Sequence, residues 1–267
     1  MLFVQVSDPH VVGDPSSPTG QRLYSGRFDT RESLRQTVMA LNGLDPRPEL
    51  VLITGDLAAL EGEDDDYRAA RTILDTLHLP YVVVPGNHDR RQGLRQFFGD
   101  RGIWAEQSRF LTVRRVVSGI HFLGLDTLDE GKPGGLLCPE RLAEAEAALT
   151  EADGAPVVLF MHHPPFVMGW DFADPIRAFG GEALERIVSG FPNVAVVLTG
   201  HLHRPIIRRF GNTVALAAPA CSRQGWADLK PDYRHRWTYE PPAFVLHKWF
   251  EGALSSFIVP LETETGA

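Results

Sequence analysis

Short apolar segments rich in Val, Leu and Ile recur along the chain up to residue 198. Because their apolar character is nearly continuous rather than alternating, we expect strands that are buried on both faces of a sheet. These segments are Leu2–Val6, Leu50–Ile53, Tyr81–Val84, His121–Leu125, Val157–Met161 and Val194–Leu198. Segments with helical spacing of apolar residues lie between them, at Thr30–Leu44, Asp65–Leu77, Pro139–Glu151 and Gly181–Ser189. This alternation predicts an α/β fold with parallel strands joined by crossover helices.

The pattern changes after residue 204, where short apolar runs follow one another without helices between them. These runs are Ile206–Phe210, Thr213–Ala217, Phe244–Trp249 and Ser255–Pro260. Separation by Gly, Asn and Pro predicts antiparallel hairpins, with a turn at Gly211-Asn212. Since no linker rich in Ser, Gly or charge interrupts the chain, we expect one domain over residues 1–267. Its hairpin-rich segment, 204–267, is expected to cap a site or to mediate oligomerisation.

Composition excludes several classes of protein. The 267 residues include 26 Lys+Arg and 34 Asp+Glu, a formal net charge of −8, whereas a binder of nucleic-acid polymers needs a basic surface. No apolar stretch approaches the roughly 18 residues of a membrane-spanning helix, so no membrane partner is expected. The first residues lack the basic and apolar regions of a secretory signal, and two cysteines cannot form a disulfide framework. We therefore expect a cytoplasmic protein.

Polar residues directly follow five of the predicted strands. Because the carboxyl ends of parallel strands meet at one edge of a sheet, we expect these residues to lie together. The segments are Asp8-Pro9-His10, Gly55-Asp56, Gly86-Asn87-His88-Asp89, His162-His163-Pro164-Pro165 and Gly200-His201-Leu202-His203. Side chains two apart on an extended chain face the same way, so Asp8 and His10, and likewise His201 and His203, are expected to share a space.

These side chains are Asp, His and Asn without a thiolate, a set that suits borderline metals such as Zn, Mn, Fe or Co. Seven candidate ligands are too many for one tetrahedral ion but are enough for two ions that share a bridging carboxylate. Glycines at 55, 86 and 200 would permit the close backbone approach that such a crowded site requires.

In this order, the five segments resemble the signature of calcineurin-like metallophosphoesterases. The His-His-Pro-Pro segment at 162–165 resembles in particular the branch of class III cyclic-nucleotide phosphodiesterases and glycerophosphodiesterases. The segment Leu23–Asp29 is also similar to the glycerophosphodiesterase members. The resemblance implies a four-layer α-β-β-α sandwich of two mixed sheets flanked by helices, to which the hairpin-rich C-terminal segment is added.

The resemblance also implies a role for each residue. It implies two divalent or mixed-valence transition-metal ions (Fe, Mn, Zn or Co), with Asp56 as the bridging ligand. The first ion would be held by Asp8, His10, Asp56 and His203. The second would be held by Asp56, Asn87, His162 and His201. His88 would be the catalytic residue near the leaving group, and His88 and Asn87 would bind the substrate.

The implied activity is that of a phosphoric diester hydrolase, in which a hydroxide bridging the two ions attacks a cyclic nucleotide or a glycerophosphodiester. Two ions, two aspartates and one hydroxide leave a charge of roughly +1, which matches a diester monoanion better than a monoester dianion. A phosphomonoesterase or protein phosphatase remains an alternative, as does a non-catalytic protein-binding scaffold. The expected partner is a small phosphodiester, and a homo-oligomer is a further possibility.

Some neighbouring residues are expected to play lesser parts. His163 is interpreted as support for its loop, Asp89 as a residue that orients its turn, and Asp126 is left outside the site. Histidines 78, 121, 235 and 247 lie outside any motif and are expected to be structural or at the surface. Trp170, Trp226 and Trp237 would line a substrate pocket or bury an oligomer contact, and the sequence does not separate these alternatives.

Overall fold

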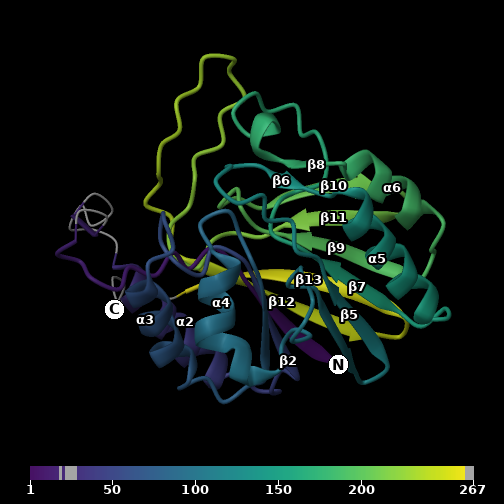
Figure 1. Ribbon diagram of the computed structural model, residues 1–267, viewed down its shortest axis with the longest axis horizontal. Coiled ribbons are helices and arrows are strands. Elements are labelled where there is room, and N and C mark those ends of the chain that lie inside the picture. Colours follow the sequence, from purple (N-terminus) through teal and green to yellow (C-terminus); the bar gives the residue numbers. More distant parts are fainter. Residues whose placement is uncertain (18–19, 22–28, 262–267) are drawn as a thin grey trace.

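A computed structural model describes residues 1–17, 20–21 and 29–261, and two mixed β-sheets form the framework of the fold (Figure 1). The first sheet has the order β13-β12-β1-β2-β3, and the second β10-β11-β9-β7-β5-β4. In the first sheet the strands are β1 (Leu2–Val6), β2 (Leu50–Thr54), β3 (Tyr81–Val84), β12 (Ala243–Phe250) and β13 (Ala253–Pro260). The second contains β4 (Val113–Val117), β5 (Ile120–Gly124), β7 (Val157–Phe160), β9 (Val194–Thr199), β10 (Ile206–Phe210) and β11 (Thr213–Ala217). A small parallel pair joins β6 (Gly135–Leu136) and β8 (Ala178–Phe179).

Helices cover the outer faces of the two sheets. The helices α2 (Thr30–Asn42), α3 (Asp64–Leu74) and α4 (Arg91–Phe98) pack on the first sheet (Figure 1). The helices α5 (Pro139–Glu151) and α6 (Gly181–Ser189) pack on the second. Short 3-10 turns occur at η1 (Gly99–Arg101) and η2 (Asp174–Ile176). The four-layer sandwich expected from the sequence is confirmed, and no helix in the described ranges is long and apolar enough to cross a bilayer.

The core between the sheets is formed by side chains from both inner faces. Phe3 of β1 meets Phe122 of β5 edge to face, with ring centroids 5.0 Å apart. Strands β1, β2, β3 and β7 are buried along their whole length, as their nearly continuous apolar sequences predict. Because both sheets are pinned by this shared core, the carboxyl ends of their parallel strands are held in fixed positions.

The bounds of several elements agree with the sequence, while others differ for identifiable reasons. Helix α3 ends at Leu74 rather than Leu77, because the next residues form tight turns in which Leu77 remains buried and so continues the apolar spacing. Strand β4 was not predicted, since as an edge strand it alternates buried and half-exposed or exposed residues. The predicted glycerophosphodiesterase-like segment lies, up to residue 28, outside the described residues.

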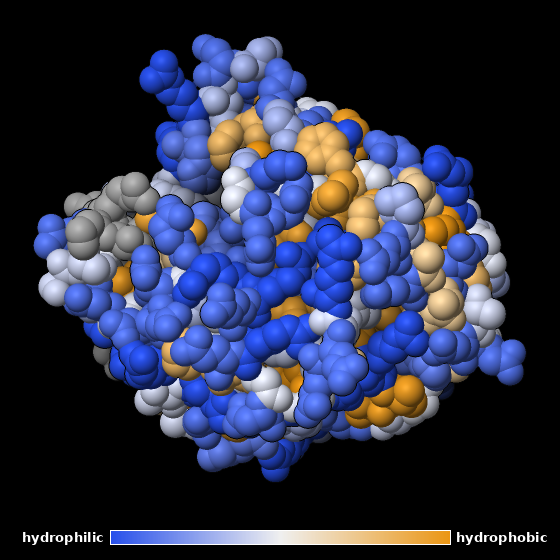
Figure 2. All heavy atoms as spheres, viewed as in Figure 1, coloured by the Kyte–Doolittle hydropathy of each residue, from blue (hydrophilic) through white to orange (hydrophobic). Residues whose placement is uncertain are grey.

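The C-terminal hairpins do not form a separate layer. The β10–β11 hairpin joins the second sheet through parallel pairing of β11 with β9. The β12–β13 hairpin joins the first sheet through antiparallel pairing of β12 with β1. In the chain between these hairpins, residues 218–225 are mostly buried, and the residues that follow project from the sandwich as the yellow-green loop at the top of Figure 1. Its tip carries mostly hydrophilic residues (Figure 2). The oligomeric role of residues 204–267 stays a prediction.

One buried titratable residue of the core makes stability depend on pH. His247 of β12 is fully buried, stacks on Phe3 with ring centroids 4.6 Å apart, and pairs with the Ser256 hydroxyl at 2.8 Å. Burial lowers the pKa of His247 to about 3. Below pH 6.5 this histidine therefore binds a proton in the unfolded chain but stays neutral in the folded chain. This contribution to stability is complete above pH 6.5 and is lost as the pH falls towards 3.

We expect His247→Phe, which keeps the stacked ring and removes the titration, to flatten the pH dependence of unfolding. The wild-type free energy of unfolding should fall relative to the variant by about 1.4 kcal/mol per pH unit between pH 6 and 4. Urea titrations of the metal-free proteins at each pH measure this difference. Ser256→Ala, which leaves the imidazole in place, is the control, and parallel curves for wild type and His247→Phe would contradict the prediction.

Candidate metal centre

Side chains from the ends of five strands meet at the carboxyl edge shared by the two sheets. Strands β1, β2 and β3 deliver residues from the first sheet, and β7 and β9 deliver residues from the second. The structure brings together all seven predicted ligand residues. They are Asp8, His10, Asp56, Asn87, His162, His201 and His203.

One group of side chains gathers around Asp8. Its Oδ1 atom lies 3.4 Å from His203 Nε2 and 3.8 Å from His10 Nε2. The two imidazole Nε2 atoms of His10 and His203 are 2.9 Å apart. Asp56 approaches the same group, because its Oδ2 lies 3.5 Å from His10 Nε2.

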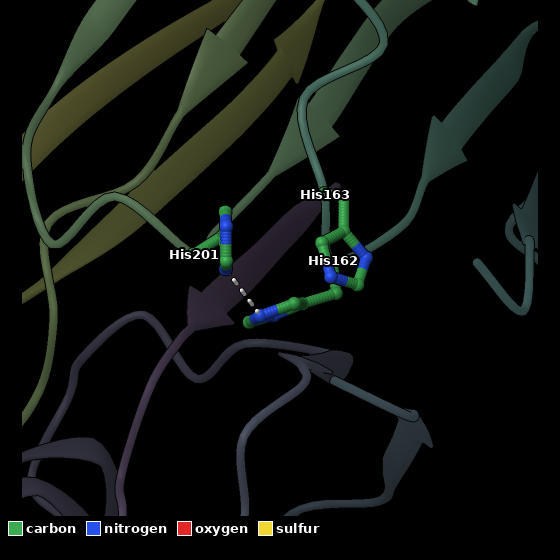
Figure 3. Close-up of side chains that lie close together, drawn as sticks. All are labelled: His162, His163 and His201. Carbon is green, nitrogen blue, oxygen red and sulfur yellow. Dashed lines mark hydrogen bonds between the residues drawn. The ribbon is translucent and has the colours of Figure 1, made fainter. Parts of the chain in front are cut away.

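A second group gathers around His162. Its Nε2 atom lies 3.3 Å from Asp56 Oδ2, 3.2 Å from Asn87 Oδ1 and 3.2 Å from His201 Nδ1. Figure 3 shows the His201 ring directed at the His162 ring, with His163 beside both. Asp56 Oδ2 therefore belongs to both groups, the position expected of a bridging carboxylate.

Backbone carbonyls fix the orientation of the key imidazoles. His162 Nδ1 donates to the Thr54 carbonyl at 2.8 Å, and His203 Nδ1 donates to the Arg223 carbonyl at 2.7 Å. In the neutral rings, Nε2 is then a bare lone pair aimed into the site. His201 differs, because it directs Nδ1 rather than Nε2 at its neighbours.

These contacts bring acceptor atoms against acceptor atoms. The lone pair of His162 Nε2 faces two oxygens, from Asp56 and Asn87. Asp8 Oδ1 is buried and has no hydrogen-bond partner among the described residues, while its Oδ2 accepts from Ser7 Oγ and the His201 backbone N–H. A buried acceptor without a donor is costly, and a cation between the acceptors would remove the cost. The donor set thus fits metal ions, and its nitrogens and oxygens suit transition metals.

The pKa values of these residues reflect the same crowding of acceptors. Burial alone lowers the pKa of His162, but the facing Asp56 carboxylate outweighs it and raises this pKa to about 9. Burial likewise raises the pKa of Asp56, but the facing His162 and His88 rings hold it well below its usual range. In the metal-free site, a proton on His162 therefore supplies the positive charge that a bound metal ion would otherwise supply.

The backbone at the ligands differs from the expected extended chain. Asp8, His10, His201 and His203 have φ values of 55°, 47°, 73° and 50°, and Asp56 has 52°. Asp8 and His10, and likewise His201 and His203, do lie close together as expected. The reason differs from the expected one, because these residues are in left-handed conformations rather than on extended strands. Left-handed conformations are costly for residues with a Cβ, and such residues cluster at functional sites.

Two glycines permit this packing. A Cβ on Gly200 would lie 1.9 Å from Ser7 Oγ, and a Cβ on Gly86 would lie 2.1 Å from Asp56 Oδ1. Asp89 holds the same loops, since its carboxylate accepts from the backbone N–H groups of Gly86, Leu57 and Ala58. The interpretation of Asp89 as a residue that orients its turn agrees with these contacts.

His88 and Asn87 lie together on the wall of a pocket that opens beside the centre. His88 Nδ1 donates to the Leu60 carbonyl at 2.8 Å, and its backbone N–H donates to Asp56 Oδ1 at 2.9 Å. The pocket has a volume of about 260 Å³. It is also lined by His10, Asp56, His201 and His203.

The comparison with family models agrees with this geometry. Residues 1–205 match the model of the calcineurin-like phosphoesterases. The chain belongs to that family. Curated relatives of this phosphoesterase include a probable glycerophosphodiester phosphodiesterase, GpdQ, of Arcobacter nitrofigilis, which is 31% identical over 94% of the chain and 89% of the relative. A probable cyclic nucleotide phosphodiesterase of Rhodopseudomonas palustris is 33% identical over 96% of each. The branch expected from the sequence is confirmed.

A solved structure shows that the same fold extends to distant proteins. A dimetal phosphatase from Danio rerio superposes on this phosphoesterase with a TM-score of 0.70, over 98% of the chain and 99% of the phosphatase. The two sequences are only 14% identical, so this likeness concerns the fold alone.

The pocket contains residues that the sequence motifs did not identify. Its outer wall is formed by Phe172, Ile176, Arg223, His235 and Trp237. His235 was expected to be structural or at the surface; it is exposed, as expected, and it also lines the pocket. The open question about tryptophans is resolved in part. Trp237 lines the pocket, Trp170 is buried behind it with Leu202, and Trp226 is exposed on the projecting loop.

His163 and Asp126 illustrate the supporting structure around the centre. His163 is fully buried, its Nδ1 lies 2.8 Å from the Thr127 hydroxyl, and its ring centroid is 4.6 Å from that of His201. One of its nitrogens lies within 4.8 Å of ligand atoms of His162 and His201, so it is closer to the site than its position after a ligand suggested. Asp126 binds Arg91 through both carboxylate oxygens and lies outside the pocket lining.

We expect Asp56→Asn to lower the metal content from about two ions per chain to one or fewer, because both groups lose their shared charge. Elemental analysis after loading with Mn²⁺ or Zn²⁺ and dialysis measures the content. His235→Ala is the matched control, since this histidine lines the same pocket without belonging to either group. A variant at Asp56 that binds as much metal as wild type would contradict the assignment.

Proposed function

We propose that this phosphoesterase hydrolyses small phosphodiesters, either cyclic nucleotides or glycerophosphodiesters. The observation that carries the proposal is the pair of acceptor groups that share Asp56 beside a pocket containing His88. The names of the relatives, a probable glycerophosphodiester phosphodiesterase and a probable cyclic nucleotide phosphodiesterase, support the same class of substrate.

In this proposal two ions, Fe, Mn, Zn or Co, are held by the two groups of side chains. Asp8, His10, Asp56 and His203 hold the first ion, and Asp56, Asn87, His162 and His201 hold the second. When bound, two such ions supply a water of lowered pKa and neutralise the charge on the phosphoryl oxygens. The carbonyls of Thr54 and Arg223 keep His162 and His203 in the tautomer that such ligation needs.

His88 is proposed as the catalytic residue. Because the Leu60 carbonyl accepts from Nδ1 in either protonation state, the ring keeps its orientation while Nε2 gains or loses a proton. Protonated His88 can therefore donate from Nε2 to the departing oxygen as a general acid. Asn87, whose Oδ1 faces His162, retains amide N–H groups that can donate to a phosphoryl oxygen.

The charge of the metal centre alone, without the cations that surround it, matches a diester better than a monoester. Two divalent ions with two aspartates and one hydroxide carry roughly +1, which a diester monoanion neutralises. The assembled set of seven ligand residues also argues for an enzyme rather than a protein-binding scaffold. The formal charge of −8 favours a small substrate over a nucleic-acid polymer. The free thiols of Cys138 and Cys221 suit a reducing cytoplasm, which we include in the proposal together with a homo-oligomer.

Metal-loaded protein should hydrolyse bis(p-nitrophenyl) phosphate, and Asn87→Ala should lower kcat/KM at least about a hundredfold because a ligand of one ion is lost. Release of p-nitrophenolate measures the rate, with p-nitrophenyl phosphate as the monoester comparison. Asn212→Ala, on the distant β10–β11 turn, should retain wild-type activity. A strong preference for the monoester would instead favour the phosphomonoesterase or protein phosphatase alternative, and absence of any metal-dependent turnover would reject the proposal.

The role of His88 can be tested through the leaving group. His88→Ala should lower kcat by about a hundredfold or more for a diester with an alkyl alcohol as leaving group. The loss should be much smaller for bis(p-nitrophenyl) phosphate, because p-nitrophenolate departs without needing a proton. Steady-state kinetics on both substrates gives the ratio, and equal losses would show that His88 does not act as a general acid.

A further inference from the structure

Within the described residues, an arginine with no acidic partner lies on the wall of the pocket. Arg223 belongs to the segment between β11 and β12, and its side chain lines the pocket together with His10, His203 and Trp237. The guanidinium carbon lies 3.9 Å from the centre of the Trp237 ring, over its face. The cation is thus held in place by an aromatic surface and by its own backbone, whose carbonyl binds His203.

The charge of Arg223 is not balanced within the described part of the chain. No carboxylate lies within 4 Å of its guanidinium there, whereas nearby Arg204 binds both carboxylate oxygens of Glu240, at 2.6 and 2.8 Å. Burial lowers the pKa of Arg223 to about 10, which leaves it cationic at neutral pH. Placing an unpaired cation in a half-buried position costs free energy, and an anion in the pocket would offset that cost.

Arg223 lies close to the candidate metal centre. Arg223 lines the same pocket as the candidate ligands His10 and His203, and its backbone carbonyl accepts a hydrogen bond from His203 Nδ1 at 2.7 Å. An anion bound at the centre would therefore lie within reach of the field of Arg223. A guanidinium can donate two parallel hydrogen bonds to a phosphate, which a single point charge cannot match in geometry.

The same arrangement disfavours a positively charged substrate group. A quaternary ammonium head group binds best on the face of an aromatic ring, but Arg223 already covers a face of Trp237. The rest of the outer wall is aromatic or apolar, with Phe172 and Ile176 beside His235, whose ring stacks on Phe172 at 5.0 Å. Such a wall suits a planar or uncharged alcohol group of a diester and repels a cationic one.

We propose that Arg223, supported by Trp237, is a specificity-determining residue that binds the phosphate of the diester and selects substrates whose alcohol groups carry no positive charge. This inference rests on the proposed phosphodiesterase function. It favours cyclic nucleotides and glycerophosphoglycerol over glycerophosphocholine as substrates. The two glycerol diesters share one alcohol group and differ in the charge of the other, which makes them a matched pair of probes.

The test compares kcat/KM for glycerophosphoglycerol, glycerophosphocholine and 3′,5′-cyclic AMP. Wild type should prefer glycerophosphoglycerol to glycerophosphocholine by about tenfold or more. Arg223→Gln should lower kcat/KM for glycerophosphoglycerol and 3′,5′-cyclic AMP by about tenfold to a hundredfold, mainly through a higher KM. The ratio of kcat/KM for glycerophosphoglycerol to that for glycerophosphocholine should fall towards one. Arg223→Lys keeps the charge but not the paired N–H donors of the guanidinium, so its kcat/KM values should lie between those of wild type and Arg223→Gln. Arg236→Gln is the matched control, because Arg236 stacks on Trp226 in the same loop but does not line the pocket.

A binding measurement separates this inference from the proposed function. Calorimetry of inorganic phosphate with metal-loaded protein should show weaker binding by Arg223→Gln than by wild type or Arg236→Gln, at unchanged metal content. If this holds while no diester is hydrolysed, the proposed function fails and the role of Arg223 in anion binding stands. If diesters are hydrolysed but KM, preference and phosphate binding of Arg223→Gln match wild type within twofold, the inference is overturned. Loss of metal from both Arg223 variants would also overturn it, since Arg223 would then be structural.

Discussion

The contact between His162 Nε2 and the oxygens of Asp56 and Asn87 is the constraint around which the rest of the structure is arranged. Lone pairs at 3.2–3.3 Å repel one another unless a positive charge lies between them. The neutral His162 ring cannot relieve this repulsion by moving its proton to Nε2, because the Thr54 carbonyl holds that proton on Nδ1. The two sheets and their shared core position the strands that carry these atoms, so packing of the core stabilises the close contacts between them.

Several features of the fold follow from that requirement. The two sheets must end at the same edge, because Asp56 comes from one of them and His162 from the other. The loops must turn sharply within one or two residues, which explains the left-handed conformations at Asp8 and Asp56 and the absence of a side chain at Gly86. Specificity is then added by residues outside this frame. The segment between β11 and β12 brings Arg223 and Trp237 to the pocket without altering the strands that carry the ligands.

Much of this structure could be predicted from the sequence, and the limits have physical causes. Buried strands such as β1 and β3 were found with their observed bounds, because a strand covered on both faces is nearly continuously apolar. Polar residues that follow such strands indicated where the centre would form. The left-handed backbone at His10 could not be predicted, since it arises from the close approach of loops distant in sequence. Arg223 and His235 were not identified either, because they reach the pocket through a long irregular loop whose course no periodicity specifies.

The division of the C-terminal hairpins between the two sheets has a consequence for how the protein is made. All seven metal-binding candidates are synthesised by residue 203, near the end of the matched family region at residue 205. Strand β12, which pairs with β1 along its length, follows only from residue 243, and the carbonyl that orients His203 belongs to residue 223. A nascent chain that has just emerged past residue 205 thus carries every candidate ligand while β1 still lacks one of its neighbours. Metal capture in the final geometry is therefore an event that follows translation of Arg223 and of strand β12.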